Sequence, residues 1–129
     1  MSSWTAIVTC LALLLYAVFG MRVARARVKY NIQAPATTGH PIFERTFRIQ
    51  SNTTEQLIIF LPSLWLFSAY VSPIWASLVG IVWIAGRVIY AISYTRDPER
   101  RAVGFVTGYL ATVFLLMGSL FSIVWQQLR

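Results

Sequence analysis

The sequence predicts an all-α integral membrane protein, a bundle of four transmembrane helices in a single domain that spans residues 1–129. Hydrophobic residues make up 57% of the chain and charged residues only 12%, whereas soluble domains carry about 25% charged residues. The mean hydropathy is +0.64. Apolar residues gather in segments close to the roughly 20 residues that cross a bilayer, where the backbone must bond to itself as helix. These segments are Trp4–Met21, Leu57–Val71, Ile74–Tyr94 and Ala102–Trp125.

The first segment, Trp4–Met21, is expected to be a membrane span. A secretory signal peptide carries its positive charges before the apolar stretch, and here four basic residues follow it, between Arg22 and Lys29. Cys10 is the only cysteine, so neither a disulfide framework nor a cysteine metal cluster is expected. We interpret Cys10 as a small apolar side chain of the first helix.

The second and third segments form a tight hairpin of two helices. Polar residues 52–56 extend the second segment at its start, and the thirty residues from Leu57 to Gly86 carry no charge. At roughly 1.5 Å per residue this run is too long for one span. Ser72-Pro73 divides it, because proline cannot continue the hydrogen-bonded interior of a helix.

The charges predict the orientation of the chain. Ten of the eleven basic residues lie around the first and third connections, and Arg129 is the exception. The positive-inside rule places these two connections in the cytosol and both termini on the opposite side. Arginines spread over helix ends are not the basic face of a nucleic-acid-binding protein. Anchoring in the headgroup layer explains four of these basic residues, Arg22, Arg25, Lys29 and Arg100.

The run FERTFRIQSNTTEQ, residues 43–56, is unusually polar for the start of an apolar helix. Arg48, Asn52 and Glu55 follow the spacing i, i+4, i+7, which places a cation, an amide and an anion on one helix face. An alternative is that the helix begins at Thr53, in which case Asn52 and Glu55 cap its N-terminus. His40, in the loop TTGHP, is expected to be only a loop residue.

The third helix repeats this pattern with Arg87, Tyr90 and Tyr94 at i, i+3, i+7. The tyrosines are also typical of the aromatic belt at a membrane interface. Arg87 lies deeper, and an arginine inside a membrane helix indicates a function and a partner. We expect that partner to be Glu55 or a bound anion.

The fourth helix begins with Arg101 at its N-terminus, where the helix dipole already favours an anion. Gly104 and Gly108 form a GxxxG pattern that allows close helix approach, within a subunit or between subunits. Together the polar residues suit a ligand with at least two negative groups, one positive group and amides between them. A small zwitterionic peptide fits, whereas a phosphate would not require the carboxylate, and no metal site is expected.

The motif FERxxRxQxNxxE, Phe43 to Glu55, resembles the signature of the membrane-associated proteins in eicosanoid and glutathione metabolism, the MAPEG family. The flanking segments PATTGHPIFER and GRVIYAISYTRDPERRA match it in spacing. The resemblance implies a homotrimer of four-helix subunits, with glutathione bound between neighbouring subunits near the cytosolic face. It further implies that Arg101 stabilises the glutathione thiolate. The glutathione-binding residues implied by position are Arg27, Arg48, Gln50, Asn52, Glu55, Gln56, Tyr90 and Tyr94, with Arg87 in a structural or supporting role.

The resemblance implies a glutathione transferase that attacks hydrophobic electrophiles, in detoxification or eicosanoid metabolism, with possible peroxidase activity toward lipid hydroperoxides. Gln56 departs from the leukotriene C4 synthase branch, which has a tyrosine there. The alternative is a non-catalytic lipid-binding scaffold like the 5-lipoxygenase-activating protein, although Glu55 and Arg101 together favour the enzyme. A small structural membrane protein with anchoring arginines is a third reading. The short tail without an organelle-retention signal favours a bacterial inner membrane.

Overall fold

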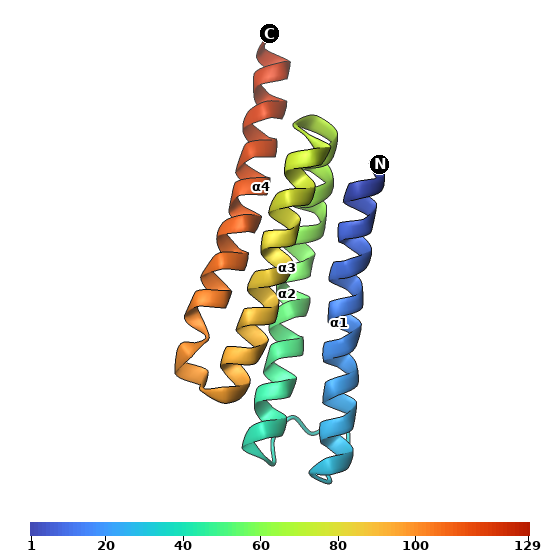
Figure 1. The fold of residues 1–129 in the computed structure, drawn as a ribbon, viewed down its shortest axis with the longest axis vertical. Coiled ribbons are helices and arrows are strands. Elements are labelled where there is room, and N and C mark those ends of the chain that lie inside the picture. Colours follow the sequence, from blue (N-terminus) through green and yellow to red (C-terminus); the bar gives the residue numbers. More distant parts are fainter.

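The computed structural model describes all 129 residues, and it is entirely helical. Each long helix runs antiparallel to the long helix before it in the chain, and a short 3-10 helix precedes the last one (Figure 1). Their bounds are α1 Ser3–Lys29, α2 Pro41–Tyr70, α3 Pro73–Arg96, η1 Pro98–Arg100 and α4 Ala102–Leu128. The predicted four-helix bundle is therefore confirmed.

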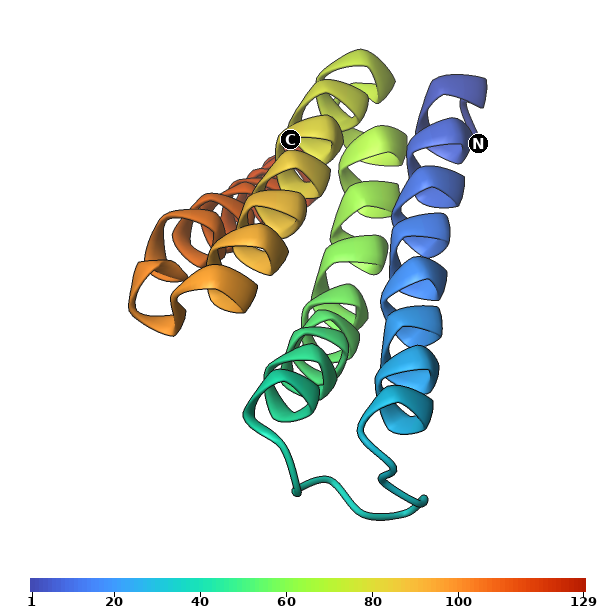
Figure 2. The same ribbon diagram turned by 60° about the horizontal axis from the view of Figure 1, so that its bottom comes forward.

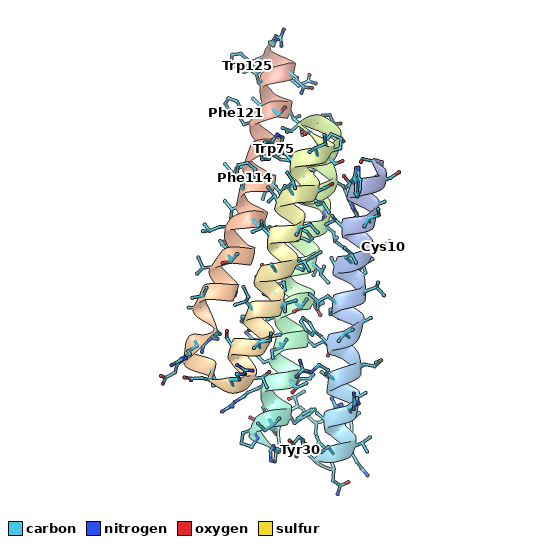
Figure 3. All side chains as sticks on the ribbon, viewed as in Figure 1. Cys10, Tyr30, Trp75, Phe114, Phe121 and Trp125 are labelled. Carbon is cyan, nitrogen blue, oxygen red and sulfur yellow. The ribbon has the colours of Figure 1, made fainter.

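Three of the helical segments are long and apolar enough to cross a membrane: Ser3–Lys29, Pro73–Arg96 and the continuous η1–α4 segment Pro98–Leu128. The helix α2 has the required length, but polar residues fill its first half. Large apolar side chains such as Trp75, Phe114, Phe121 and Trp125 project from the bundle (Figure 3) and are more than a third exposed. Such a surface is suited to lipid, because lipid tails solvate apolar side chains.

The helix α2 begins much earlier than the capping alternative required. His40 is its N-cap, accepting a hydrogen bond at Nδ1 from the backbone N–H of Ile42 at 3.1 Å, and Pro41 occupies the first helical position. Asn52 and Glu55 lie eleven residues or more inside this helix, so the interpretation of these two residues as a cap is wrong. His40 lies in the loop as expected, just before the helix, and it has in addition this capping role.

The connections between helices follow the local signals. The helix α1 ends where Asn31 adopts a left-handed backbone with φ of 56°, a conformation that asparagine tolerates. The hairpin between α2 and α3 is confirmed: Ser72 accepts a hydrogen bond from the N–H of Trp75, and Pro73 starts α3. Both termini lie toward the end of the bundle that holds this hairpin (Figure 1). The first and third connections lie at the other end.

The helices α3 and α4 approach most closely where glycines meet. A Cβ added to Gly104 would collide with the backbone N of Tyr90, and one added to Gly86 would lie 2.9 Å from the N of Gly108. Gly104 therefore packs against α3 of its own chain. Deeper in the bundle, Phe60 and Trp83 stack with ring centroids 4.0 Å apart, and both are fully buried. This packing fixes how α2 and α3 lie against each other.

Candidate functional site

A cavity of about 890 Å³ opens between α2, α3 and the start of α4. It lies at the end of the bundle that carries the first and third connections, where α3 and α4 diverge from α1 and α2 (Figure 2). The cavity is lined by Arg48, Asn52, Glu55, Gln56, Tyr90, Tyr94, Glu99, Arg101, Ala102, Phe105 and Val106. Seven of the predicted site residues are therefore brought together from three helices.

The α2 side of the cavity carries the row predicted from the i, i+4, i+7 spacing. Arg48 Nη1 lies 3.9 Å from Glu55 Oε1, with the two side chains 54% and 58% exposed. An ion pair this long and this open to solvent contributes little to stability. Each of the two side chains can therefore give up this ion pair and bind a charged group of a ligand instead. Asn52 lies between them and is buried, while Gln56 is half-buried beside Glu55.

The opposite side is aromatic. The rings of Tyr90 and Tyr94 lie with their centroids 5.5 Å apart, and Tyr90 also packs against Phe105 of α4 at 6.3 Å. Tyr90 is 3% exposed, so most of its ring belongs to the helix packing, although the residue lines the cavity. Phe105, Val106 and Ala102 continue this side along α4. These three side chains form an apolar strip that extends from the polar part of the cavity along α4.

Arg101 is the residue that joins the two sides. It forms the N-cap of α4, directly after η1, and no side chain caps the first turn of α4. The first N–H groups of an α-helix have no hydrogen-bond partner within that helix. Its Nη1 donates to the carbonyl of Pro98 at 2.6 Å, and its guanidinium lies 5.7 Å from the centre of the Tyr94 ring. The fixed cation and the helix dipole both favour an anion at this position.

Arg87 is buried as its depth predicted, but it forms no ion pair with Glu55, one of its two expected partners. It is 1% exposed, and its Nη2 donates to Asn52 Oδ1 at 2.8 Å and to Thr53 Oγ1 at 2.9 Å. Glu55 pairs with Arg48 instead, because its side chain faces the cavity rather than the helix interface. Arg87 does not line the cavity.

Two predicted residues lie away from the cavity. Arg27 Nη1 donates to the carbonyl of Ala36 at 2.7 Å, and its guanidinium lies 4.9 Å from the centre of the Phe43 ring. Gln50 faces α1, because its Nε2 would lie 3.3 Å from a Cβ placed on Gly20. A single chain therefore does not bring Arg27 and Gln50 together with the other site residues.

The cavity also contains residues that the sequence did not single out. Glu99, in the 3-10 turn, adds a second carboxylate, and Phe105 and Val106 add the apolar strip. The available signal was the segment DPERR, whose turn residues bring Glu99 and Arg101 to the same helix end. The charged lining thus consists of two arginines and two carboxylates, which suits a ligand that carries both signs of charge.

Comparisons with known proteins agree with these features. A family model described as "MAPEG family" matches residues 5–121. An uncharacterized protein of Synechocystis is 50% identical over 123 residues, covering 95% of this chain and 90% of the relative. Human microsomal glutathione S-transferase 2 is 40% identical, covering 76% of this chain and 68% of the relative. Guinea-pig (Cavia porcellus) leukotriene C4 synthase is also 40% identical, with 74% of this chain and 64% of that protein covered.

Proposed function

The chain belongs to the MAPEG family, and from this premise we propose that it is a membrane-bound glutathione transferase that activates the glutathione thiolate for attack on hydrophobic electrophiles. The observation that carries the proposal is the composition of one cavity. Two arginines, two carboxylates and two phenols meet there beside an apolar strip. The human relative is named as a glutathione S-transferase, and the guinea-pig relative is named as a leukotriene C4 synthase.

The chemistry of glutathione matches the lining group by group. Glutathione has two carboxylates, one ammonium, two peptide groups and a thiol. Glu55 suits the ammonium, and Arg48 suits a carboxylate, which a guanidinium binds through paired hydrogen bonds. Asn52 and Gln56 offer amides to the peptide groups, and Tyr90 and Tyr94 offer phenols.

Arg101 is assigned to the thiolate. A free thiol has a pKa of about 8.5, and a neighbouring arginine or a helix N-terminus lowers it. Arg101 combines both effects, since it is a cation at the uncapped start of α4. The thiolate then attacks the electrophilic carbon and displaces its leaving group, or opens a strained ring, so that a new C–S bond forms. The apolar strip of Phe105 and Val106 provides a path for a substrate that arrives from the bilayer.

A homotrimer completes this site. Arg27 and Gln50 face away from the cavity of their own chain, as residues that serve a neighbouring subunit would. The basic ends of the helices favour an orientation with the first and third connections in the cytosol and both termini outside. The Synechocystis relative favours a bacterial inner membrane. An alkaline phosphatase joined to the C-terminus tests this orientation, because that reporter is active only outside the cytosol. We expect the fusion to be active.

The function is tested by the ultraviolet absorbance of the thiolate when glutathione is added to the purified protein. We expect a thiolate signal for the unmutated protein and its loss in Arg101→Ala. Conjugation of a chloronitrobenzene at neutral pH should fall about tenfold or more, because each unit of thiol pKa changes the thiolate fraction about tenfold. Arg100→Ala is the matched control, since Arg100 is 83% exposed, pairs only with Asp97 and does not line the cavity.

The same assays separate the alternatives. Glutathione binding without a thiolate signal and without conjugation would contradict the transferase and favour the lipid-binding scaffold. If the protein reduces a lipid hydroperoxide at a higher rate than it conjugates the chloronitrobenzene, its main activity is that of a peroxidase. In that reaction the outer oxygen of the hydroperoxide passes to the sulfur and the lipid is left as an alcohol. A second glutathione then attacks the sulfenic acid, which forms the disulfide and releases the oxygen as water.

A further inference from the structure

Arg87 is a buried cation whose presence is not explained by packing or stability. A charge inside a membrane helix is costly, and buried arginines are ordinarily paired with a carboxylate. Arg87 is 1% exposed and forms no ion pair in the chain. Its Nε also lacks a hydrogen-bond partner. Replacement by an apolar side chain would relieve these costs, so stability alone does not explain this arginine.

The contacts that Arg87 does make lead to the cavity. Its Nη2 donates to Asn52 Oδ1 at 2.8 Å, and its guanidinium lies 4.3 Å from the centre of the Tyr90 ring. Asn52 and Tyr90 both line the cavity, whereas Arg87 does not. Arg87 thus lies directly behind two residues that would touch a ligand.

The direction of these hydrogen bonds fixes the orientation of the Asn52 amide. A guanidinium only donates hydrogen bonds, so the atom of Asn52 that faces Arg87 must be the oxygen. Thr53 is consistent with this arrangement, because its hydroxyl accepts from Arg87 and donates to the carbonyl of Ile49 at 2.7 Å. With the oxygen engaged, the amide has only its NH2 group left for the cavity. Asn52 is therefore a hydrogen-bond donor toward any ligand.

We propose that Arg87 is a positioning residue that makes Asn52 a fixed donor to an oxygen of glutathione, a peptide carbonyl or a carboxylate, and supports the Tyr90 ring beside it. The inference rests on the proposed function, since it names what the same cavity recognises. Without Arg87 the amide of Asn52 can rotate and present its oxygen, which repels a ligand oxygen. The binding of glutathione weakens, whereas the thiolate at Arg101 is unaffected.

The first test measures glutathione binding by calorimetry on detergent-purified protein, together with turnover at saturating glutathione. In Arg87→Met the dissociation constant should rise about tenfold, the usual cost of one lost hydrogen bond, while turnover changes less than about twofold. Arg87→Lys, which can still donate to Asn52, should be intermediate. Arg96→Met, an exposed residue of the same helix outside the cavity, should bind as the unmutated protein does.

A double-mutant cycle distinguishes positioning from a general structural role. If Arg87 acts through Asn52, the double variant Arg87→Met/Asn52→Ala binds no more weakly than Asn52→Ala alone. If the fold-changes in the dissociation constant of the two single variants multiply in the double variant, the inference is overturned. So would unchanged binding in a folded Arg87→Met.

A second variant keeps the test decisive if Arg87→Met does not fold. Asn52→Asp retains an acceptor for Arg87, and gains an ion pair with it, but presents only oxygens to the cavity. We expect a protein at least as resistant to thermal unfolding, with glutathione affinity reduced at least tenfold. Unaltered affinity in Asn52→Asp would refute the donor role. If the unmutated protein binds no glutathione, the proposed function fails instead, so the two failures are distinguishable.

Discussion

Glu55 and Glu99 both line the cavity, and they differ in how firmly the fold holds them. Glu55 lies in the interior of α2, with Arg48 on the same helix face and Asn52 between them. Glu99 belongs to a 3-10 turn of three residues and is exposed. An ammonium group bound in a defined orientation needs a carboxylate on a rigid element, which favours Glu55.

This difference gives a prediction about the amino group of glutathione. Glu55→Gln removes the charge while keeping the shape, so the KM for glutathione should rise about tenfold, in line with losing a charge-assisted hydrogen bond. An analogue of glutathione without its amino group should be affected much less. Glu99→Gln is the matched control and should leave the preference for the amino group intact. If Glu99→Gln abolishes that preference and Glu55→Gln does not, the two assignments must be exchanged.

Most individual site residues could be predicted from the sequence because they share helix faces. The i, i+4, i+7 spacing of Arg48, Asn52 and Glu55 is a property of one helix, and all three line the cavity. The partner of Arg87 depends on the register between α2 and α3, which Phe60, Trp83 and the rest of the buried contacts determine. Spacing within one helix carries no information about that register.

At the level of elements, the approach of α3 to α4 carries Tyr90 to the cavity. The GxxxG pattern indicated a close approach but not its partner or which glycine matters more. In the structure, Gly104 meets the backbone of α3 at Gly86 and Tyr90, whereas a Cβ on Gly108 would be 3.6 Å from Arg87 Cδ, an ordinary contact. The two glycines of the motif therefore differ in their tolerance of a methyl group.

We expect Gly104→Ala to lower the free energy of unfolding by about 1–3 kcal/mol, the usual cost of overpacking, and to weaken glutathione binding by displacing Tyr90. Gly108→Ala, four residues along the same helix, should be neutral or stabilising, since alanine favours helix over glycine. Thermal unfolding of the two variants in detergent makes the comparison. Equal destabilisation of the two variants, or none in Gly104→Ala, would contradict this difference between the two glycines.

The start of α2 shows how a local signal can be outweighed. Asn52 and Glu55 fit a helix cap by sequence spacing, but His40-Pro41 provides a cap and a first helical residue further upstream. Once the helix has begun at Pro41, nothing between it and Asn52 interrupts it. The polar residues 43–56 therefore lie on a continuous helix, where they can form one side of a cavity.

At the scale of the whole molecule, one chain supplies only part of the predicted site. Arg48, Arg101 and the tyrosines line the cavity, but Arg27 lies near the end of α1 and Gln50 lies on the side of α2 that faces α1. The sequence placed all of these residues near one membrane boundary, and in the structure they lie toward the same end of the bundle. It could not tell whether they meet within one chain, because that depends on how subunits assemble.

A cyclic homotrimer would place the Arg27 and Gln50 side of one subunit against the Arg101 side of the next. Co-expression of Arg27→Ala with Arg101→Ala then tests the arrangement, because each variant alone should have little activity. Random mixing regenerates unmutated residues on both sides of about a quarter of the interfaces, a consequence of cyclic head-to-tail assembly. Activity should recover toward that fraction of the unmutated level.

The matched control is co-expression of Arg27→Ala with Gln50→Ala. Both changes lie on the same side of the interface, so every mixed interface keeps one defect and activity should not recover. Recovery in this control as well would show that subunit mixing acts through stability rather than through a shared site. No recovery for Arg27→Ala with Arg101→Ala, in oligomers shown by tagged co-purification to be mixed, would exclude a site shared between subunits. Arg27 would then act within its own chain, through its contacts with Ala36 and Phe43.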